Sequence, residues 1–323
     1  EIDITMNILK EVMQSAPKMK VIVNGDDALS AYLAMESGNP YVTYGISEKV
    51  VDDKDSHEIR EGRFCKKCGA PLKYNFYHYS QLGDYACTGC DFKRPAIEYD
   101  ASDVAVSDHL AFTVDGRRLE ANYKGFYNVY NILAAYAAGR TGGLELEHFQ
   151  DMLKKFNPEN GRMEQFRDPQ SNTLAIVDYA HNYASVTALL DFVYERWGEE
   201  NPRITLVTGS AGNKAYDRRK EIVEAAENRI ANFIFTAEDT DTEPIIDICM
   251  EMQGYITNKD VVSTVISDRL TAITNAIYDA RAHADRFNIL LIIGKGNERW
   301  IKDHRKHVPF DGDDHVVERM FGL

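Results

Sequence analysis

The chain has 323 residues, enough for about two domains of ~150 residues each. Hydrophobic residues make up 44% and charged residues 27%, a balance typical of globular domains with a buried core. The net charge of −14 argues against nucleic acid as a general partner, because phosphate binding needs a surplus of Lys and Arg. The longest apolar runs, such as Ile289–Ile293, are too short for a transmembrane segment, and no signal peptide opens the chain. We therefore expect a cytoplasmic protein.

The first third of the chain predicts two strands, a helix and an inserted module. Residues 19–24 are typical of a short buried strand, and a helical pattern follows the turn at 25–27 and runs through Met35. A second strand is expected at Tyr41–Ile46. The composition then changes at about residues 62–97, which contain four cysteines and few aliphatic side chains. We interpret this segment as an inserted module.

A hairpin and a helix are expected next. Asp115-Gly116 favours a tight turn between strands at Ala111–Val114 and Arg118–Ala121. The Ala-rich pattern over Asn128–Arg140 predicts a helix, which a pair of glycines ends.

The second half of the chain alternates between strands and helices. Asn, Pro and Gly cluster at Asn157–Gly161, where we place a domain boundary that divides the chain into residues 1–160 and 161–323. The alternation predicts an α/β domain with a doubly wound, Rossmann-like parallel sheet. The expected strands are Thr173–Val177, Ile204–Thr208, Phe233–Thr236, Val261–Ile266 and Ile289–Ile293, and the expected helices include Ala184–Trp197, Arg218–Arg229 and Asp268–Arg281.

Four of the five cysteines form two Cys-x2-Cys pairs that are separated by 18 residues. Each pair can point two sulfurs at one ion, so together they predict a tetrahedral four-thiolate zinc site. Because such a shell has no open position, the zinc would be structural. Two disulfides or an iron–sulfur cluster are weaker alternatives, and the fifth cysteine, Cys249, is expected in the core. The predicted ligands are Cys65, Cys68, Cys87 and Cys90.

Several short strings, in order along nearly the whole chain, resemble motifs of the Mur ligase family. Each string is weak evidence, and their order is the stronger signal. The similar strings are Val23-Asn-Gly-Asp-Asp27 (NADDP), Gly125 to Ala135 (GxxNxxNxxAA), Gly161-Arg-Met-Glu164 (GRxE), Val177-Asp-Tyr-Ala-His181 (VDYAH), Gly209 to Lys220 (GxGGxRDxxKR), Gly294-Lys-Gly-Asn-Glu298 (GKGHE) and Phe310-Asp311 (FDD).

The cysteine-rich module resembles the MurT subfamily, at Tyr79–Tyr85 and at Phe92–Pro95. MurT proteins work with GatD, a glutamine amidotransferase, and amidate a lipid-linked stem peptide. The second half looks more like MurE, the tripeptide synthase. MurT proteins usually carry NPAG where this chain has His181-Asn182-Tyr183, and their SWIWD string does not occur here. MurE enzymes that use diaminopimelate carry DNPR where this chain has Glu238–Asp241, so a carboxylate replaces an arginine and would attract an amine. The amine donor therefore stays open, as does the UDP-linked or lipid-linked form of the muramyl-peptide acceptor.

The resemblance implies an ATP- and Mg²⁺-dependent amide ligase that acts through an acyl phosphate and builds peptidoglycan. No residue is assigned as catalytic. Two plainer interpretations stand beside the implied roles: Asn128 as a helix N-cap and His181 as a core histidine. The implied nucleotide-binding residues are Asn128, Asn131, Arg162, Asp178, His181 and Asn182. The implied substrate-binding residues are Asp239, Asp241, Gly294, Lys295 and Glu298.

One part that the chemistry requires does not occur in the sequence. No Gly-x4-Gly-Lys-Ser/Thr phosphate loop is present, and Gly294-Lys295-Gly296 lacks its spacing and its hydroxyl residue. We expect that an N-terminal segment carrying this loop is missing, and that the 323 residues alone are inactive. The alternatives are a non-catalytic Mur homologue that acts as an interaction subunit, and a zinc-ribbon protein that binds nucleic acid through basic residues near the cysteines.

Overall fold

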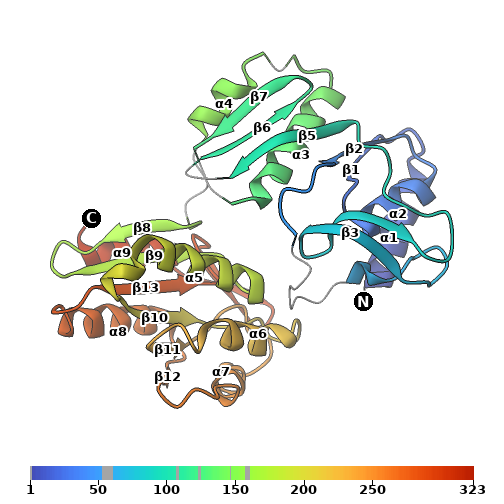
Figure 1. The fold of residues 1–323 in the computed structure, drawn as a ribbon. Coiled ribbons are helices and arrows are strands. Elements are labelled where there is room, and N and C mark those ends of the chain that lie inside the picture. The colour runs from blue at the N-terminus through green and yellow to red at the C-terminus, as the bar shows by residue number, and fades with distance from the viewer. Residues whose placement is uncertain (1, 53–60, 107–108, 123–124, 146, 157–160) are drawn as a thin grey trace. The chain divides into compact units, whose positions relative to one another are not determined.

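The computed structural model describes residues 2–52, 61–106, 109–122, 125–145, 147–156 and 161–323 (Figure 1). The chain forms two compact units, residues 1–157 and 158–323. The predicted boundary at Asn157–Gly161 lies, up to residue 160, outside the described residues. Within the part of the chain that is described, no helix has the length and apolar character needed to cross a bilayer.

The first unit is built on a five-stranded sheet with the order β1-β2-β5-β6-β7. The strands β1, β2 and β5 are parallel, and β6 and β7 continue the sheet as an antiparallel hairpin. Asp115 and Gly116 have φ angles of 50° and 69° at the hairpin turn, which confirms the expected turn. The strands are β1 (Val21–Asn24), β2 (Tyr41–Ile46), β5 (Tyr99–Val106), β6 (Leu110–Val114) and β7 (Arg117–Ala121).

Helix α3 (Tyr127–Thr141) and helix α4 (Phe149–Lys155) form the core of this unit with the sheet. Helix α2 (Ala28–Ser37) begins directly after Asp27, whose side chain accepts a hydrogen bond from the backbone of Leu29 and caps the helix. Helix α1 (Ile2–Ser15) packs on α2. The sequence analysis did not identify α1, α4 or β5.

The cysteine-rich module is the connection between β2 and β5. These strands are parallel neighbours, so the chain has to cross over between them, and the connection carries the module. The module contains a short 3₁₀ helix, η1 (Glu61–Arg63), and an antiparallel pair, β3 (Leu72–Tyr79) and β4 (Leu82–Cys87). Its buried side chains pack on one face of α2 and form a small core with Ala28, Ala31, Cys65, Tyr74, Tyr85 and Phe92.

The second unit has a six-stranded sheet with the order β12-β11-β10-β13-β9-β8. All neighbouring strands are parallel except β8, which lies antiparallel at one edge and was not predicted. The five predicted strands are present, with ends that differ by no more than one residue. The observed strands are β8 (Glu164–Arg167), β9 (Thr173–Asp178), β10 (Arg203–Thr208), β11 (Asn232–Phe235), β12 (Val262–Val265) and β13 (Asn288–Ile293).

Helices cover both faces of this sheet, which confirms the doubly wound fold. Successive side chains of a strand point to opposite faces, so Leu174 and Ile176 join one core cluster while Ala175 and Val177 join the other. The first cluster includes α5 (Tyr183–Trp197), α6 (Asp217–Ala226) and α7 (Ile245–Gly254), and the second includes α8 (Arg269–Ala282) and α9 (Asp313–Phe321). A short 3₁₀ helix, η2 (Gly198–Glu200), follows α5, and a hairpin of β14 (Trp300–Asp303) and β15 (Lys306–Pro309) precedes α9.

Candidate functional site

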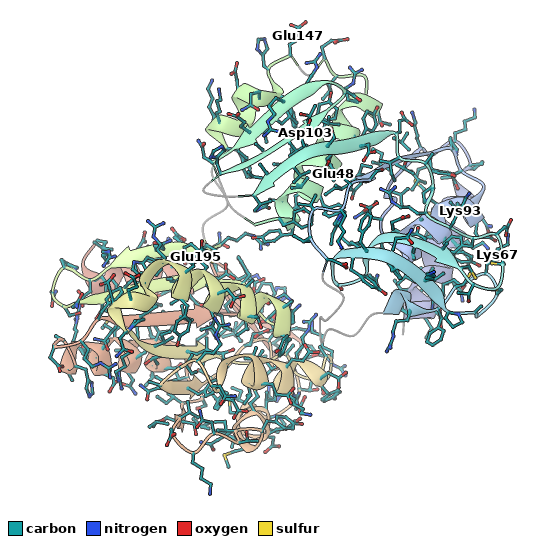
Figure 2. All side chains as sticks on the ribbon, in the orientation of Figure 1. Glu48, Lys67, Lys93, Asp103, Glu147 and Glu195 are labelled. Carbon is teal, nitrogen blue, oxygen red and sulfur yellow. The ribbon has the colours of Figure 1, made fainter. Side chains whose placement is uncertain are left out.

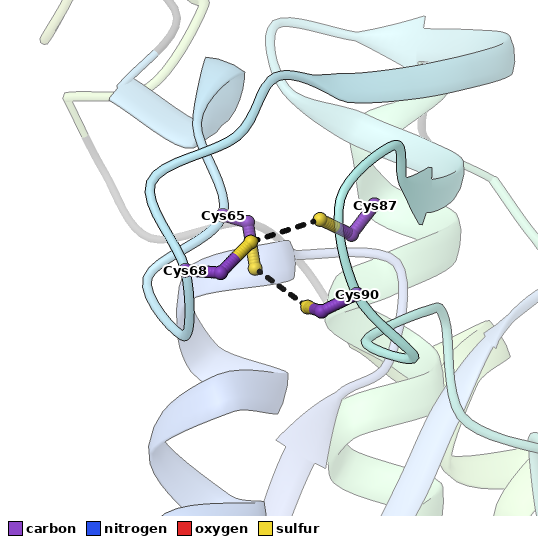
Figure 3. Close-up of side chains that lie close together, drawn as sticks. All are labelled: Cys65, Cys68, Cys87 and Cys90. Carbon is purple, nitrogen blue, oxygen red and sulfur yellow. Dashed lines mark hydrogen bonds between the residues drawn. The ribbon is translucent and has the colours of Figure 1, made fainter.

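The four predicted cysteine ligands come together in the inserted module (Figure 3). Their sulfur atoms lie within 4.8 Å of one another, and the Cys65–Cys90 and Cys68–Cys87 sulfur distances are 3.7 and 3.4 Å. A tetrahedral zinc with Zn–S bonds of about 2.3 Å would separate its sulfurs by roughly 3.8 Å. All four are free thiols, so the disulfide interpretation does not hold in this structure. The cluster therefore has the composition and size of a four-thiolate metal site.

In the second unit, most of the predicted site residues lie at the carboxyl edge of the parallel sheet. Strand β9 ends at Asp178, and the loops that follow β11 and β13 start at Thr236 and Gly294. Ligands of open α/β sheets bind at this edge, because the loops that leave parallel strands gather there. The residues on these loops are Asp178, His181, Asn182, Asp239, Asp241, Gly294, Lys295 and Glu298.

Asp178 joins two segments of this edge. Its Oδ2 accepts a hydrogen bond from the backbone N–H of Met163 at 2.8 Å, and its Oδ1 accepts one from Ala180 at 2.8 Å. Burial raises the pKa of Asp178, and the two backbone bonds and the charge of Arg162 partly oppose that rise. The carboxylate thus holds the loop that carries Arg162 against the end of β9.

His181 and Asn182 follow on the same loop with different surroundings. The His181 ring is partly buried at the edge of the unit, not in the core, and its Nδ1 lies 2.7 Å from the carbonyl oxygen of Tyr179. Since a carbonyl only accepts, Nδ1 carries a proton and Nε2 is the acceptor of the neutral ring. Asn182 caps helix α5: its Oδ1 accepts the backbone N–H of Ser185 at 2.9 Å in a capping box. The Asn182 side chain therefore has a structural role of its own.

Lys295 is the centre of a charged cluster on the loop after β13. It is 1% exposed, and its Nζ lies 2.8 Å from Asp239 Oδ1 and also contacts the carboxylate of Glu298. The ammonium group lies 4.3 Å from the centre of the Trp300 ring. A buried ammonium needs such partners, and Lys295 consequently fixes the positions of both carboxylates.

The carboxylate of Asp241, which the sequence analysis expects to attract a substrate amine, has two partners in the folded unit. Its Oδ2 lies 3.1 Å from Lys302 Nζ, and its Oδ1 accepts the backbone N–H of Arg305 at 2.9 Å. The hydrogen bond from Lys302 lowers the pKa of Asp241. Asp241 therefore anchors the β14–β15 hairpin, a contact that the sequence could not reveal because Lys302 lies 61 residues further along the chain.

Two further residues at this edge were not selected from the sequence. Glu238 Oε2 is buried without a hydrogen-bond partner among the described residues, and burial raises the pKa of Glu238. A Cβ on Gly294, which has φ +103°, would lie 2.7 Å from Glu238 Oε2, so glycine leaves room for this carboxylate. Tyr179 contacts Asn297 through its hydroxyl, and the guanidinium of Arg162 lies 4.9 Å from its ring centre. Both Glu238 and Tyr179 come shortly after a buried strand, and this position in the sequence could have marked them as candidate site residues.

In the first unit, Asn128 and Asn131 lie in the first turns of α3. The N-cap position belongs to Phe126, so the interpretation of Asn128 as a helix N-cap is wrong. Asn131 Nδ2 donates a hydrogen bond to Asn128 Oδ1 at 3.0 Å. The two amides therefore form one polar patch on the helix, with Asn131 exposed to solvent.

Comparison with known proteins assigns a family to the second unit. Residues 161–296 match the model of the Mur ligase, glutamate ligase domain. Over 246 residues, 74% of this chain and 46% of the relative, the chain is 75% identical to a UDP-N-acetylmuramyl-tripeptide synthetase of Bifidobacterium longum (strain NCC 2705). It is also 30% identical, over 66% of this chain and 48% of the relative, to the lipid II isoglutaminyl synthase (glutamine-hydrolyzing) subunit MurT of Staphylococcus aureus (strain COL). The chain thus spans about half the length of these curated relatives.

A solved structure agrees with this result. The chain resembles a pseudomurein peptide ligase type C from Methanothermus fervidus with a TM-score of 0.66 and 25% identity. The similarity covers 90% of this chain and 57% of that chain, so both compact units have counterparts in it.

Proposed function

Residues 161–296 form a Mur ligase glutamate ligase domain, and from this premise we propose that the chain is part of an ATP-dependent amide ligase of peptidoglycan synthesis. The observation that carries the proposal is the set of polar side chains that this domain gathers at the carboxyl edge of its sheet. In the proposed reaction, ATP phosphorylates a carboxylate of a muramyl peptide. An amine then attacks the acyl phosphate, an amide bond forms and phosphate leaves. We expect the protein to act in the cytoplasm.

We propose two groups of residues for the nucleotide. The amides of Asn128 and Asn131 can both donate and accept, which suits the edge of an adenine. Arg162, Asp178 and His181 would bind the ribose or the phosphates, and Mg²⁺ would neutralise phosphate charge when bound. We also propose Asn182 as a nucleotide-binding residue because it lies on the same loop as Asp178 and His181, although its Oδ1 caps α5.

The amine substrate is proposed to bind at the loops after β11 and β13. Glu298 would hold its ammonium group by a charge-assisted hydrogen bond, with Lys295, which also pairs with Asp239, fixing the position of the Glu298 carboxylate. Gly294 provides space beside Glu238. Asp241 contributes by anchoring the hairpin that carries Trp300.

The proposal contains two variants that differ in the amine donor. A MurE-like enzyme would join a free amino acid to a UDP-linked acceptor, and a MurT-like enzyme would use ammonia from a GatD-like partner on a lipid-linked acceptor. The full-length enzyme should be assayed with both substrate pairs, with product mass as the measurement. If neither pair gave an amide product, the alternative of a non-catalytic interaction subunit would be favoured.

We propose that the four-cysteine cluster binds one structural Zn²⁺ per chain, and we expect Cys65→Ser to abolish the binding. The sulfurs are already close enough for a tetrahedral ion, and metal binding and folding are coupled in small modules of this kind. The measurement is the zinc content of protein purified without chelator. Cys249→Ser is the matched control, since Cys249 is buried in the other unit and should leave one zinc per chain. Wild-type protein without zinc would refute the assignment.

We expect the 323 residues alone not to hydrolyse ATP. Their sequence has no Gly-x4-Gly-Lys-Ser/Thr motif, whose backbone N–H groups and lysine would bind the phosphates. The measurement is steady-state phosphate release from the chain, compared with the full-length protein. ATP hydrolysis by the chain that Asp178→Ala abolishes would contradict this expectation.

A further inference from the structure

The cysteine-rich module makes hydrogen bonds to the loop at residues 25–27, which follows β1 at the carboxyl edge of the first sheet. The contacts come from the β3–β4 hairpin, so they join two segments more than 50 residues apart in the sequence. They are hydrogen bonds from Gly83 N to Asp26 O (3.0 Å), from the Tyr85 hydroxyl to Gly25 O (3.2 Å) and from Gln81 Nε2 to Asp27 Oδ1 (2.9 Å).

Asp26 is the centre of this contact, and its side chain is fully buried. Arg94, which follows the second cysteine pair, places Nε and Nη2 each 2.7 Å from Asp26 Oδ1. From the other side, the hydroxyl of Tyr130 on α3 donates to Asp26 Oδ2 at 2.7 Å. Because a buried carboxylate needs its partners, Asp26 ties the position of Tyr130 to that of Arg94.

A second contact joins the module to the same tyrosine. His78 on β3 is buried, and its Nδ1 lies 2.6 Å from the Tyr130 hydroxyl. Its Nε2 lies 3.0 Å from the carbonyl oxygen of Glu48. Burial lowers the pKa of His78 to about 4. Tyr130 is thus held by one residue of the module directly and by another through Asp26.

Arg94 follows the turn that carries the second cysteine pair, and backbone hydrogen bonds join both to β4. Cys87 N donates to the Phe92 carbonyl at 2.8 Å and closes the turn that contains Cys90. Two residues later, Arg94 N donates to the Tyr85 carbonyl at 2.9 Å. A metal held by the four thiolates would fix this turn and, with it, the direction of the Arg94 side chain.

We infer that metal loading of the four-cysteine cluster positions the first turn of α3, through Arg94, Asp26 and Tyr130. These three are positioning residues. Tyr130 lies between Asn128 and Asn131 in the sequence, so the same turn carries both amides proposed for the nucleotide. The inference rests on the proposed zinc site, and its consequence for catalysis rests on the proposed role of these amides.

Hydrogen exchange of the whole 323-residue chain tests the coupling without a nucleotide. We expect removal of zinc by a chelator to speed exchange in the first turns of α3 by about tenfold, since local opening governs amide exchange. The β6–β7 hairpin is the internal reference and should keep its protection. Unchanged exchange in α3, or an equal loss of protection in β6–β7, would overturn the inference.

Two variants distinguish coupling through Arg94, Asp26 and Tyr130 from a general loss of stability of the module. Arg94→Gln should speed α3 exchange even with zinc bound, whereas Lys93→Gln removes the same charge from the neighbouring, exposed position and should not (Figure 2). Tyr130→Phe keeps the ring and removes the hydroxyl. In that variant, zinc removal should no longer change α3, and a zinc effect equal to that of the wild type would contradict the proposed path.

The full-length enzyme tests the consequence separately. There, Arg94→Gln should raise the KM for ATP and leave kcat at saturating ATP nearly unchanged, because it displaces a binding helix. Zinc-dependent exchange in α3 with an unchanged KM for ATP would support the coupling and refute only the nucleotide role of Asn128 and Asn131.

Discussion

Arg269→Met is expected to destabilise the second unit by about 3–5 kcal/mol, because it leaves a buried carboxylate without its partner. Arg269 and Asp313 are both fully buried, and the guanidinium places Nε and Nη2 each 2.7 Å from the Asp313 carboxylate. The same guanidinium donates to the carbonyl oxygens of Ala237 and Ile293, at 2.9 and 2.8 Å. It therefore joins the ends of β11 and β13, from which the proposed amine-binding loops extend.

The tryptophans make this prediction easy to measure. Both tryptophans of the chain, Trp197 and Trp300, lie in the second unit, so urea unfolding followed by tryptophan fluorescence reports on that unit. Arg286→Met is the matched control, since Arg286 is exposed, and its cost should stay below about 1 kcal/mol. The double variant Arg269→Met, Asp313→Leu should recover much of the loss, since it removes both charges. Equal stability of Arg269→Met and the control would refute the argument.

Glu298→Ala and Asp178→Ala should have opposite effects on the two substrates of the full-length enzyme. Glu298→Ala is expected to raise the KM for the amine about 10- to 100-fold, since a hydrogen bond to a charged group contributes ~1.5–3 kcal/mol. The KM for ATP should change little. Asp178→Ala is expected to raise the KM for ATP about tenfold, because it releases the Met163 backbone and with it the loop that carries Arg162.

Steady-state kinetics with each substrate varied in turn measures this difference. Glu298→Gln is the control that keeps the shape of the side chain and removes its charge, and it should behave like Glu298→Ala for the amine. If both alanine variants raised the KM for ATP alone, the proposed amine pocket would be misplaced. The assignment of the second unit to the Mur ligase domain family would still hold.

Much of the architecture could be predicted from local patterns. Apolar runs and helical periods located every parallel strand of the second sheet, because β9, β10, β11 and β13 are largely buried and rich in apolar residues, while the edge strand β12 still alternates with predicted helices. The spacing of the cysteines predicted which four thiols come together, since each Cys-x2-Cys pair forms a tight turn that points both sulfurs to the same side. Elements with weaker local signals, such as α1, α4, the edge strand β8 and the β14–β15 hairpin, were not identified.

The tertiary structure alone decided which polar groups are already occupied. Nothing in the sequence around Asp241 indicates a partner, yet in the structure its carboxylate accepts hydrogen bonds from the Lys302 side chain and the Arg305 backbone. Asp26 and Arg94 are 68 residues apart, and only the folded first unit brings them together beside Tyr130. The reason is physical: periodicity and spacing report on neighbours along the chain, whereas partners of a buried charge are chosen by packing between distant segments.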